Sequence, residues 1–421
     1  MRRAAGGAPA RAAERRSKLK IVHVITRLIL GGAQENTILS AREAARRGHR
    51  VVLLAGPPDG PEGSLLEAAR AEPFRTVLVP ALCRAVNPYR DLVAYADLLK
   101  HFRDLRPDVV HTHSSKAGIL GRRAARQAGV PCIVHTIHGL AFDRYAGPIA
   151  RRLYRAAERR AAAWSDRLIA VSGRTADRAA EAGLAPRDRI AVIYSGIETE
   201  RFAGASPERE AVRARWGAGP ETFVFVKLAR LHHLKGHRYV LAAFAEVARQ
   251  YPAVLLVLLG EGILRPQLEA QARQLGIAGR VRFEGLVPPE DVPAALWAAD
   301  AVVHAGLREG LARALIQAGL CGRPVIAYDI GGAAEVVEDG VNGWLLAAPA
   351  ARAGLDAASR PLAAAMRRMA ADPGAARRMG GRWPPEVLAR FDYRVMAERI
   401  LEVYAEVRGS GGAAGTEGTS R

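Results

Sequence analysis

Short apolar runs alternate with longer amphipathic segments along nearly the whole chain, and this alternation limits the possible folds more than any other feature. The first group of runs lies at 20–26, 50–56, 75–80, 108–113, 132–138, 167–172 and 190–196. The pattern restarts after about residue 220 with further runs, the last of them ending near Tyr328. Nearly continuous apolar strands that alternate with helices predict an α/β protein with doubly wound parallel sheets.

The break between the two groups of strands predicts two domains. Residues 201–221 show no strand pattern and are rich in Gly and Pro, which is typical of a connection between cores. We therefore expect two Rossmann-like domains, over 19–200 and 222–390, that face each other across a cleft. The interval 201–221 would be the linker and the hinge on which the cleft closes.

The two ends of the chain differ in pattern. Apolar side chains recur at helical spacing near the C-terminus, at Met396, Ile400, Val403 and Val407. This spacing predicts an amphipathic helix over 391–408, which we expect to cross back to the first domain. Residues 1–18 and 409–421 have little apolar surface to bury and are expected to be disordered tails.

The chain is strongly basic, with 62 Lys and Arg against 42 Asp and Glu and a net charge of +20. An arginine-rich gene composition explains this charge as well as attraction to an anionic partner does. Basic side chains also crowd the first 20 residues, at Arg2, Arg3, Arg11, Arg15, Arg16, Lys18 and Lys20. Such a tail predicts docking on an anionic membrane surface, at about 1 kcal/mol per basic residue; the alternative is an arm without a partner.

Several classes of protein are disfavoured by composition. The three cysteines, Cys83, Cys132 and Cys321, are scattered without metal spacing, which fits a reducing cytoplasm. No apolar run approaches the roughly 20 residues that span a bilayer, and the basic N-terminus lacks the apolar stretch of a signal peptide. Aromatic and basic residues are not interleaved, and we expect no nucleic-acid partner. The expected location is the cytoplasm, with peripheral contact at the inner face of the membrane.

Ligands of open parallel sheets bind beyond the carboxyl ends of the strands, so the residues that follow each strand are the candidate site. Gly31 and Gly32 follow the first strand and allow backbone amides to approach a ligand. His111 and His113 end the fourth strand, followed by Ser114 and Lys116. The two histidines are either a metal pair or packed imidazoles, and a metal would need further ligands that the nearby sequence does not offer.

Other strand ends carry groups suited to a phosphorylated ligand. His138 ends the fifth strand and is suited to hydrogen bonding or proton transfer. In the second half, Arg230 and Lys235 flank a short loop, where a guanidinium and an ammonium can converge on a diphosphate. Glu309 precedes a helix whose N-terminal amides, beginning near residue 312, favour phosphate.

Taken together and in order, these motifs resemble those of the retaining glycosyltransferases of the GT-B fold, family 4. The resemblance covers residues 20 to 407. It rests on the segments GGAQ, VHTHSSKAG, HTIHG, VSGRT, SGIETERF, RLHHLKGH, GEG at 260 and REGLARALIQAGLCGRPVIAYDIGG. It implies a nucleotide-diphosphate sugar bound mainly by the second domain and an acceptor presented by the first.

The resemblance also assigns roles to individual positions. Arg230 and Lys235 would hold the donor diphosphate, and Glu309 would be the first acid of an E-x7-E motif that contacts the transferred sugar. The second acid of the motif falls on Gln317, which keeps an acceptor oxygen but lacks the charge. The further donor-binding positions would be Gly31, Gly32, Gly260, Glu261, Gly310 and Leu311. His138 would face the reacting region, and the acceptor side would hold His113, Ser114 and Lys116.

The activity implied is transfer of a sugar, with retained anomeric configuration, to a glycan or lipid-linked acceptor in envelope polysaccharide or glycolipid synthesis. No D-x-D motif occurs in the chain, so we expect neither a metal nor another cofactor. One alternative is a nucleotide-sugar epimerase of the same fold. A second is a metal-dependent hydrolase that uses His111 and His113.

Overall fold

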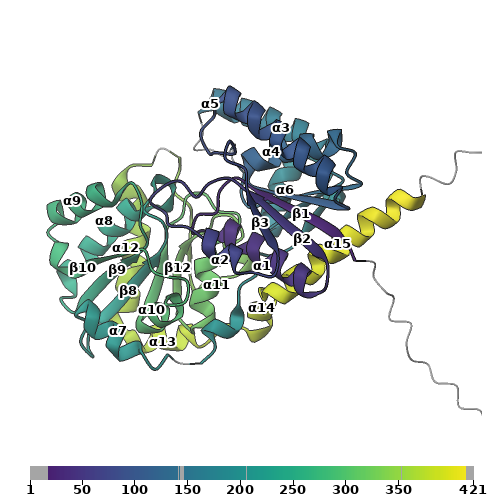
Figure 1. The fold of residues 1–421 in the computed structure, drawn as a ribbon. Helices are drawn as coiled ribbons and strands as arrows, with labels where there is room; N and C mark the ends of the chain where they lie inside the picture. Colours follow the sequence, from purple (N-terminus) through teal and green to yellow (C-terminus); the bar gives the residue numbers. More distant parts are fainter. Residues whose placement is uncertain (1–17, 141, 143–146, 205, 352, 414–421) are drawn as a thin grey trace, which may run out of the picture.

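The computed structural model describes residues 18–140, 142, 147–204, 206–351 and 353–413. It contains two parallel sheets, each covered by helices on both faces (Figure 1). The predicted α/β fold with two Rossmann-like domains is therefore confirmed. Of the expected disordered tails, 1–18 and 409–421, the parts at 1–17 and 414–421 lie outside the described residues, whereas 409–413 continue a helix, contrary to the prediction.

The first sheet has seven parallel strands in the order β3-β2-β1-β4-β5-β6-β7. Their bounds are β1 Lys20–Ile25, β2 Arg50–Ala55, β3 Arg75–Leu78, β4 Val109–His113, β5 Cys132–Ile137, β6 Arg167–Ala170 and β7 Ile190–Val192. The helices of this part are α1 Gly32–Arg46, α2 Leu66–Arg70, α3 Pro88–Leu105, α4 Ser115–Gln127, α5 Pro148–Ala162 and α6 Gly173–Glu181, with a 3-10 turn η1 at Arg187–Arg189. Each predicted run in this half contains one of the seven strands.

The second sheet has six parallel strands in the order β10-β9-β8-β11-β12-β13. They are β8 Phe223–Leu228, β9 Val254–Leu259, β10 Val281–Gly285, β11 Ala301–His304, β12 Val325–Tyr328 and β13 Gly343–Leu346. The associated helices are α8 His237–Gln250, α9 Arg265–Gln274, α10 Val292–Ala298, α11 Arg313–Leu320, α12 Leu355–Ala371, α13 Pro373–Gly380 and α14 Pro385–Ala389, with 3-10 turns η3 His233–Lys235, η4 Ala278–Arg280 and η5 Ala333–Glu335. The edge strand β13 was not predicted.

The connection between the domains differs from the expected linker. After η2 (Thr199–Phe202), residues 209–216 form helix α7 (Arg209–Trp216), and Phe202, Val212 and Trp216 are buried in the core of the second domain. The chain crosses between the domains near Ile197, whose amide donates to Phe391 O at 2.7 Å. Most of the interval 201–221 therefore belongs to the second domain.

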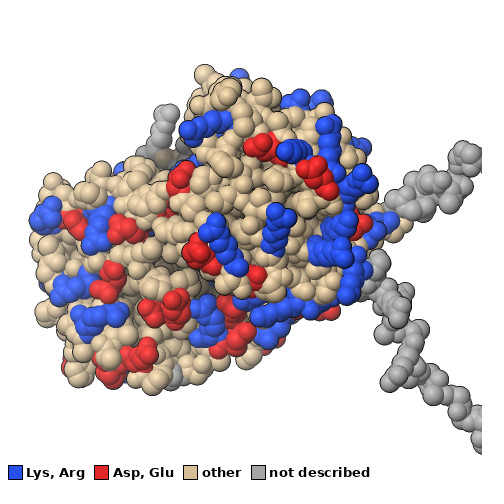
Figure 2. All heavy atoms as spheres, viewed as in Figure 1, with Lys and Arg blue, Asp and Glu red and all other residues tan. Residues whose placement is uncertain are grey.

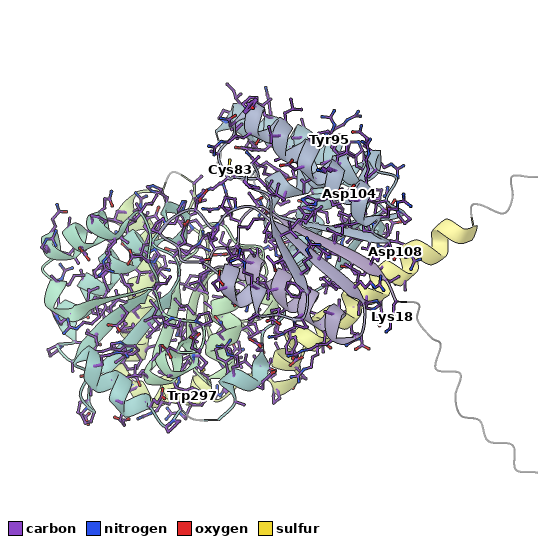
Figure 3. All side chains as sticks on the ribbon, in the orientation of Figure 1. Lys18, Cys83, Tyr95, Asp104, Asp108 and Trp297 are labelled. Carbon is purple, nitrogen blue, oxygen red and sulfur yellow. The ribbon has the colours of Figure 1, made fainter. Side chains whose placement is uncertain are left out.

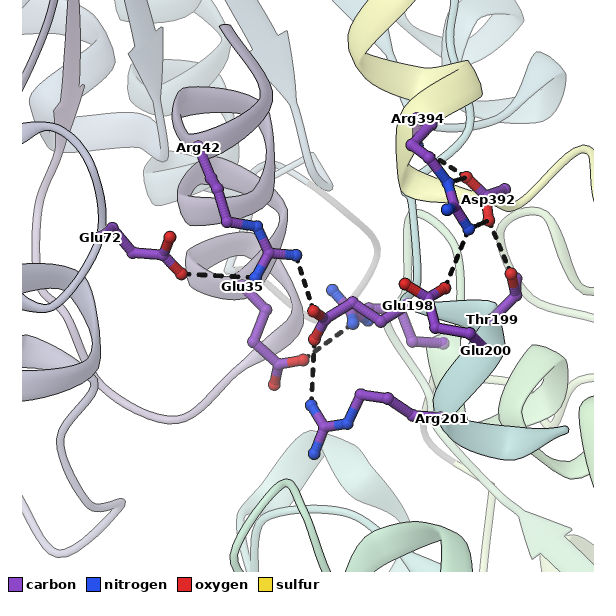
Figure 4. A network of polar contacts seen from close by, with 10 residues as sticks. Glu35, Arg42, Glu72, Glu198, Thr199, Glu200, Arg201, Asp392 and Arg394 are labelled. Carbon is purple, nitrogen blue, oxygen red and sulfur yellow. Dashed lines mark hydrogen bonds and ion pairs between the residues drawn. The ribbon is translucent and has the colours of Figure 1, made fainter. Parts of the chain in front are cut away.

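The long helix α15 (Tyr393–Ala413) returns to the first domain, as predicted, and extends beyond 408 (Figure 1). Its apolar side packs into one face of the first sheet beside α1, through Met396, Ile400, Val403 and Tyr404. The start of α15 and residues 198–201 are tied by contacts drawn in Figure 4: Arg394 pairs with Glu200 at 3.0 Å, and the Thr199 hydroxyl donates to Asp392 at 2.6 Å. The two crossings of the chain therefore lie side by side.

Strand β8 carries a lysine, Lys227, in an otherwise apolar and buried strand. Its side chain is 0% exposed, and Nζ has no hydrogen-bond partner among the described residues. Burial and the charge of Lys235 lower the pKa of Lys227 from 10.5 to about 7, against the opposing effect of Glu309. The folded chain therefore binds a proton here more weakly than the unfolded chain does.

This lysine should reduce stability near neutral pH. Between pH 7 and 10.5 the unfolded chain holds more protons at this position, so the wild-type free energy of unfolding rises with pH. We expect Lys227→Met to stabilise the protein by about 2–4 kcal/mol at or below neutral pH, with the gain disappearing above about pH 10.5. Urea unfolding of the variant across this range measures the effect. Lys100→Met, at an exposed position of α3, is the control, and an equal gain at every pH would contradict the explanation.

Candidate active site

A cleft lies between the two domains at the carboxyl ends of both sheets. It consists of two adjoining cavities of about 240 and 420 Å³. Strand order reverses between β1 and β4 in the first sheet and between β8 and β11 in the second. The loops that follow these strands line the cleft, so the points at which open sheets usually bind ligands face each other.

The centre of the cleft holds an ion pair between Lys235 of η3 and Glu309, which follows β11. Lys235 Nζ lies 2.6 Å from Glu309 Oε1, and His304 Nε2 lies 3.3 Å from the same oxygen. Burial alone would raise the pKa of Glu309, but Lys235 and His304 outweigh it and lower the pKa to about 2. Glu309 is therefore a carboxylate at any physiological pH, able to accept hydrogen bonds but not to donate a proton.

Two arginines complete a positively charged wall. Arg230 follows β8, and its Nη1 lies 3.4 Å from Oε1 of Glu62 in the first domain. Arg313, the first residue of α11, lies 2.8 Å from Glu35 of α1 and donates to Gly32 O at 3.3 Å. The N-terminus of α11 opens into the same space, where its partial positive charge adds to that of the side chains.

Glycines allow the backbones in the cleft to approach closely. A Cβ at Gly310 would lie 2.3 Å from His138 O in the opposite domain. Gly236, with a φ of +68°, precedes α8, and a Cβ there would lie 2.0 Å from Ala305 O. Neither position can take a side chain without moving the loops that carry Lys235 and Glu309.

Most of the predicted site residues line this cleft. Six line both cavities: Gly31, Gly32, Arg230, Lys235, Glu309 and Leu311. Gly260, Glu261 and Gln317 line the smaller cavity, and Ser114, His138 and Gly310 line the larger one. The side chains proposed for contact with a ligand therefore meet around one space, with two exceptions.

The exceptions are Lys116 and His113 on the acceptor side. Lys116 Nζ lies 2.5 Å from Asp91 of α3 and does not line either cavity. His113 is fully buried behind the cleft wall. The sequence analysis did not predict Glu62 or Arg313. Arg313 could have been recognised as a basic residue at the start of the helix after Glu309, whereas no pattern marks Glu62.

The pair His111 and His113 is joined in the structure by His23. Their ligand atoms lie within 4.8 Å of one another, the one such group with metal-binding potential among the described residues. However, His111 Nδ1 lies 2.6 Å from the Tyr404 hydroxyl and Nε2 lies 2.7 Å from Thr136 Oγ1. With both ring nitrogens already bonded, the arrangement favours packed imidazoles over a metal site.

Comparison with known proteins identifies the same architecture. A family described as Glycosyltransferase Family 4 matches residues 30–201, and one described as Glycosyl transferases group 1 matches residues 208–379. The chain is 31% identical, over 78% of its own length and 84% of the relative's, to UDP-Gal:alpha-D-GlcNAc-diphosphoundecaprenol alpha-1,3-galactosyltransferase of Escherichia coli. It is 29% identical to D-inositol 3-phosphate glycosyltransferase of Nocardia farcinica, over 89% and 84% of the two chains.

Solved structures agree on the fold. Anabaena HepE, crystallised with UDP and glucose, superposes with a TM-score of 0.74 at 24% identity, over 92% of this chain and 100% of that one. WaaG, a glycosyltransferase involved in lipopolysaccharide biosynthesis, superposes with a TM-score of 0.72 at 20% identity, over 91% and 99%. The chain thus belongs to the group 1 glycosyltransferases of the GT-B fold.

Proposed function

We propose that this glycosyltransferase moves a sugar, with retained configuration, from a nucleotide-diphosphate sugar to a glycan or lipid-linked acceptor of the cell envelope. The observation that carries the proposal is the convergence of Arg230, Lys235 and Arg313 with the N-terminus of α11 on one cleft. These groups suit a diphosphate that gains negative charge as it leaves. The adjacent carboxylate of Glu309 suits the hydroxyls of the sugar next to it.

In the proposed reaction the bond from the anomeric carbon to the diphosphate oxygen breaks, and a bond from that carbon to the acceptor oxygen forms on the same face. The acceptor proton passes to the departing phosphate oxygen. Lys235 and Arg230 stabilise the charge on that phosphate, and Glu309 orients the sugar. The protein thus contributes position and electrostatic stabilisation rather than a covalent intermediate.

The carboxylates of the cleft support this choice of mechanism. Among the described residues, six glutamates line the two cavities, and each one is within ion-pair distance of a basic side chain: Glu35, Glu62, Glu158, Glu198, Glu261 and Glu309. An ion pair with Lys or Arg makes a carboxylate a weaker nucleophile and competes with a metal ion for its oxygens. We therefore favour a reaction without a glycosyl-enzyme intermediate and without a metal.

The relatives suggest which donor class to test first. The E. coli relative is named for UDP-Gal, and the HepE structures contain UDP-glucose or UDP. We propose a UDP-sugar on this basis. Transfer, as opposed to epimerisation, is favoured by the relatives, which are named as a galactosyltransferase and a glycosyltransferase.

Loss of the central cation should disable transfer. We expect Lys235→Ala to lower kcat by about 10²–10³-fold, because it removes a charge from the leaving diphosphate and leaves Glu309 buried without its partner. Release of nucleoside diphosphate from a panel of nucleotide sugars, with and without acceptor, provides the assay. Lys100→Ala is the matched control, and a chelator should not change the wild-type rate. Full turnover by Lys235→Ala, or sugar isomerisation without acceptor, would contradict the proposal.

Gln317 allows a gain-of-affinity test. It lines the smaller cavity, eight residues after Glu309 and on the helix α11. A carboxylate accepts a stronger hydrogen bond from a ribose hydroxyl than an amide does, by about 1 kcal/mol. Gln317→Glu should therefore lower the donor KM about fivefold with little change in kcat. Gln250→Glu, at the exposed end of α8, controls for added charge, and an unchanged or higher KM in the Gln317 variant would argue against ribose contact.

The outer helices of the first domain suit a membrane-bound acceptor. Exposed apolar side chains gather on two segments, with Val86, Tyr89 and Leu92 around the start of α3 and Ile149, Leu153 and Tyr154 on α5. Helix α5 also exposes Arg151, Arg152, Arg155, Arg159 and Arg160, whereas its one acid, Glu158, is buried against Arg122. Such a mixture of apolar and basic side chains fits an anionic lipid surface.

The location of this surface strengthens the proposal. Helices α3, α4 and α5 form one outer layer of the first domain, marked by Tyr95 and Asp104 of α3 in Figure 3. Glu158 of α5 also lines the larger cavity, so the surface adjoins the cleft. Over the second domain, basic and acidic side chains are interspersed on the face drawn in Figure 2. No described helix combines the length and the apolar composition that crossing a bilayer requires.

Vesicle binding tests this surface. We expect the double variant Ile149→Asn/Leu153→Asn to bind vesicles of phosphatidylcholine and phosphatidylglycerol at least tenfold more weakly than wild type, because two apolar side chains no longer enter the interface. Ile263→Asn/Leu355→Asn, at exposed apolar positions of the second domain, is the matched control. Deletion of residues 1–18 measures the share of the basic tail. Equal binding to pure phosphatidylcholine, or equal loss in both double variants, would refute a docking face on α5.

A further inference from the structure

A row of three hydrogen-bonded histidines leads from the core of the first domain to the cleft. His23 lies on β1, His113 ends β4 and His138 follows β5, three strands that are neighbours in the sheet. His23 Nδ1 lies 3.1 Å from His113 Nε2, and His113 Nδ1 lies 3.1 Å from His138 Nε2. The first two rings are fully buried, and the third lines the larger cavity.

The rings are joined edge to edge through their nitrogens. The ring centroids of His23 and His113 are 5.4 Å apart with planes only 17° from parallel, and those of His113 and His138 are also 5.4 Å apart. This separation is about that of two rings linked by an N–H···N bond in the ring plane. His111, in contrast, lies against the face of His113 at 4.3 Å and bonds to Tyr404 and Thr136 instead.

All three rings are neutral at physiological pH. Burial lowers the pKa of His23 to about 3 and that of His113 well below its ordinary value. Burial and the charge of Arg313 lower the pKa of His138 to about 4. A neutral imidazole has one N–H donor and one acceptor nitrogen. The two hydrogen bonds of the row must therefore run in the same direction.

The inner end of the row selects the direction. His23 Nε2 is buried and has no partner among the described residues. If the bonds ran inward from His138, this nitrogen would carry a buried N–H without an acceptor, which folded proteins rarely contain. If the bonds run outward, His23 and His113 each carry their proton on Nδ1, and each N–H donates to the next ring of the row.

We propose that the row fixes the proton of His138 on Nδ1, so that this ring presents a hydrogen-bond donor to the cleft. His113 and His23 are then positioning residues that act through His138. A donor at this place suits a hydroxyl or phosphate oxygen of a bound ligand and excludes His138 as the base that removes the acceptor proton. The consequence for catalysis rests on the proposed transfer reaction, whereas the position of the proton does not.

The tautomer can be observed directly in the full-length protein labelled with 15N-histidine. Two-bond 1H–15N spectra distinguish an Nδ1–H ring from an Nε2–H ring, and the signals of His138 are identified by their absence in His138→Gln. We expect wild type to show the Nδ1–H form alone. An Nε2–H form, or a mixture of the two, would overturn the proposal.

Two substitutions at His113 test the cause. His113→Phe keeps a ring but removes both bonds, and His113→Asn is the milder variant, because its amide can offer either an oxygen or an N–H to His138. In each we expect mixed tautomers of His138. His111→Asn, on the same strand but outside the row, should leave the His138 signals unchanged. A folded His113 variant that retains the wild-type tautomer would contradict the role of the row.

Kinetics and metal titration provide independent readouts. If donation from Nδ1 stabilises the transition state, both His113 variants should lower kcat about tenfold with a smaller effect on the donor KM. Failure to detect any sugar transfer would remove the proposed function but leave the tautomer result standing. Stoichiometric binding of Zn²⁺ that shifts the signals of His23, His111 and His113 together would instead show a metal site and overturn the row as described.

Discussion

The arrangement of the molecule depends on the place where the chain passes between its two domains. The amide of Ile197 donates to Phe391 O, and the amide of Tyr393 donates to Ile197 O at 3.0 Å, so the outgoing and the returning chain are bonded to each other. The ion pair of Arg394 with Glu200 and the hydrogen bond of Thr199 to Asp392 reinforce this contact (Figure 4). Both crossings lie side by side, and the carboxyl ends of the two sheets face the same cleft.

Within that cleft, the basic side chains are paired with glutamates. The side chains that would meet a diphosphate come from the second domain, at the ends of β8 and β11 and the start of α11. Several of them are held by glutamates, some from the same domain and some from the other. The ion pair of Lys235 with Glu309 places an ammonium group 2.6 Å from a carboxylate whose pKa is lowered to about 2, which matches a ligand that is charged at its phosphates and polar at its sugar.

Much of this could be predicted from the sequence, because buried parallel strands are visible as apolar runs and the groups after them are few. Arg230, Lys235 and Glu309 were found for this reason. The helix α7 was missed although Val212 and Trp216 are one helical turn apart, because Gly and Pro on either side dominated the interpretation of the segment.

What could not be predicted depends on contacts between segments that are distant in sequence. Glu62 lies in a loop without any pattern, and nothing near it in the chain indicates that Arg230 is its partner. His23 and Lys227 did carry a signal, as polar residues inside apolar strands. Their surroundings, however, follow from strand order, which places β1 next to β4 and β8 next to β11 and which the local sequence does not specify.

The contact between Glu62 and Arg230 has a consequence for selectivity. Within the protein, the carboxylate of Glu62 already pairs with the guanidinium group of Arg230. An incoming ligand with a single anionic group would do little more than replace Glu62, which would keep only its longer contact with Arg27, at 3.8 Å. A ligand with two linked phosphate groups can contact Arg230 and Lys235 together, so competition from Glu62 favours a diphosphate over a ligand that reaches only Arg230.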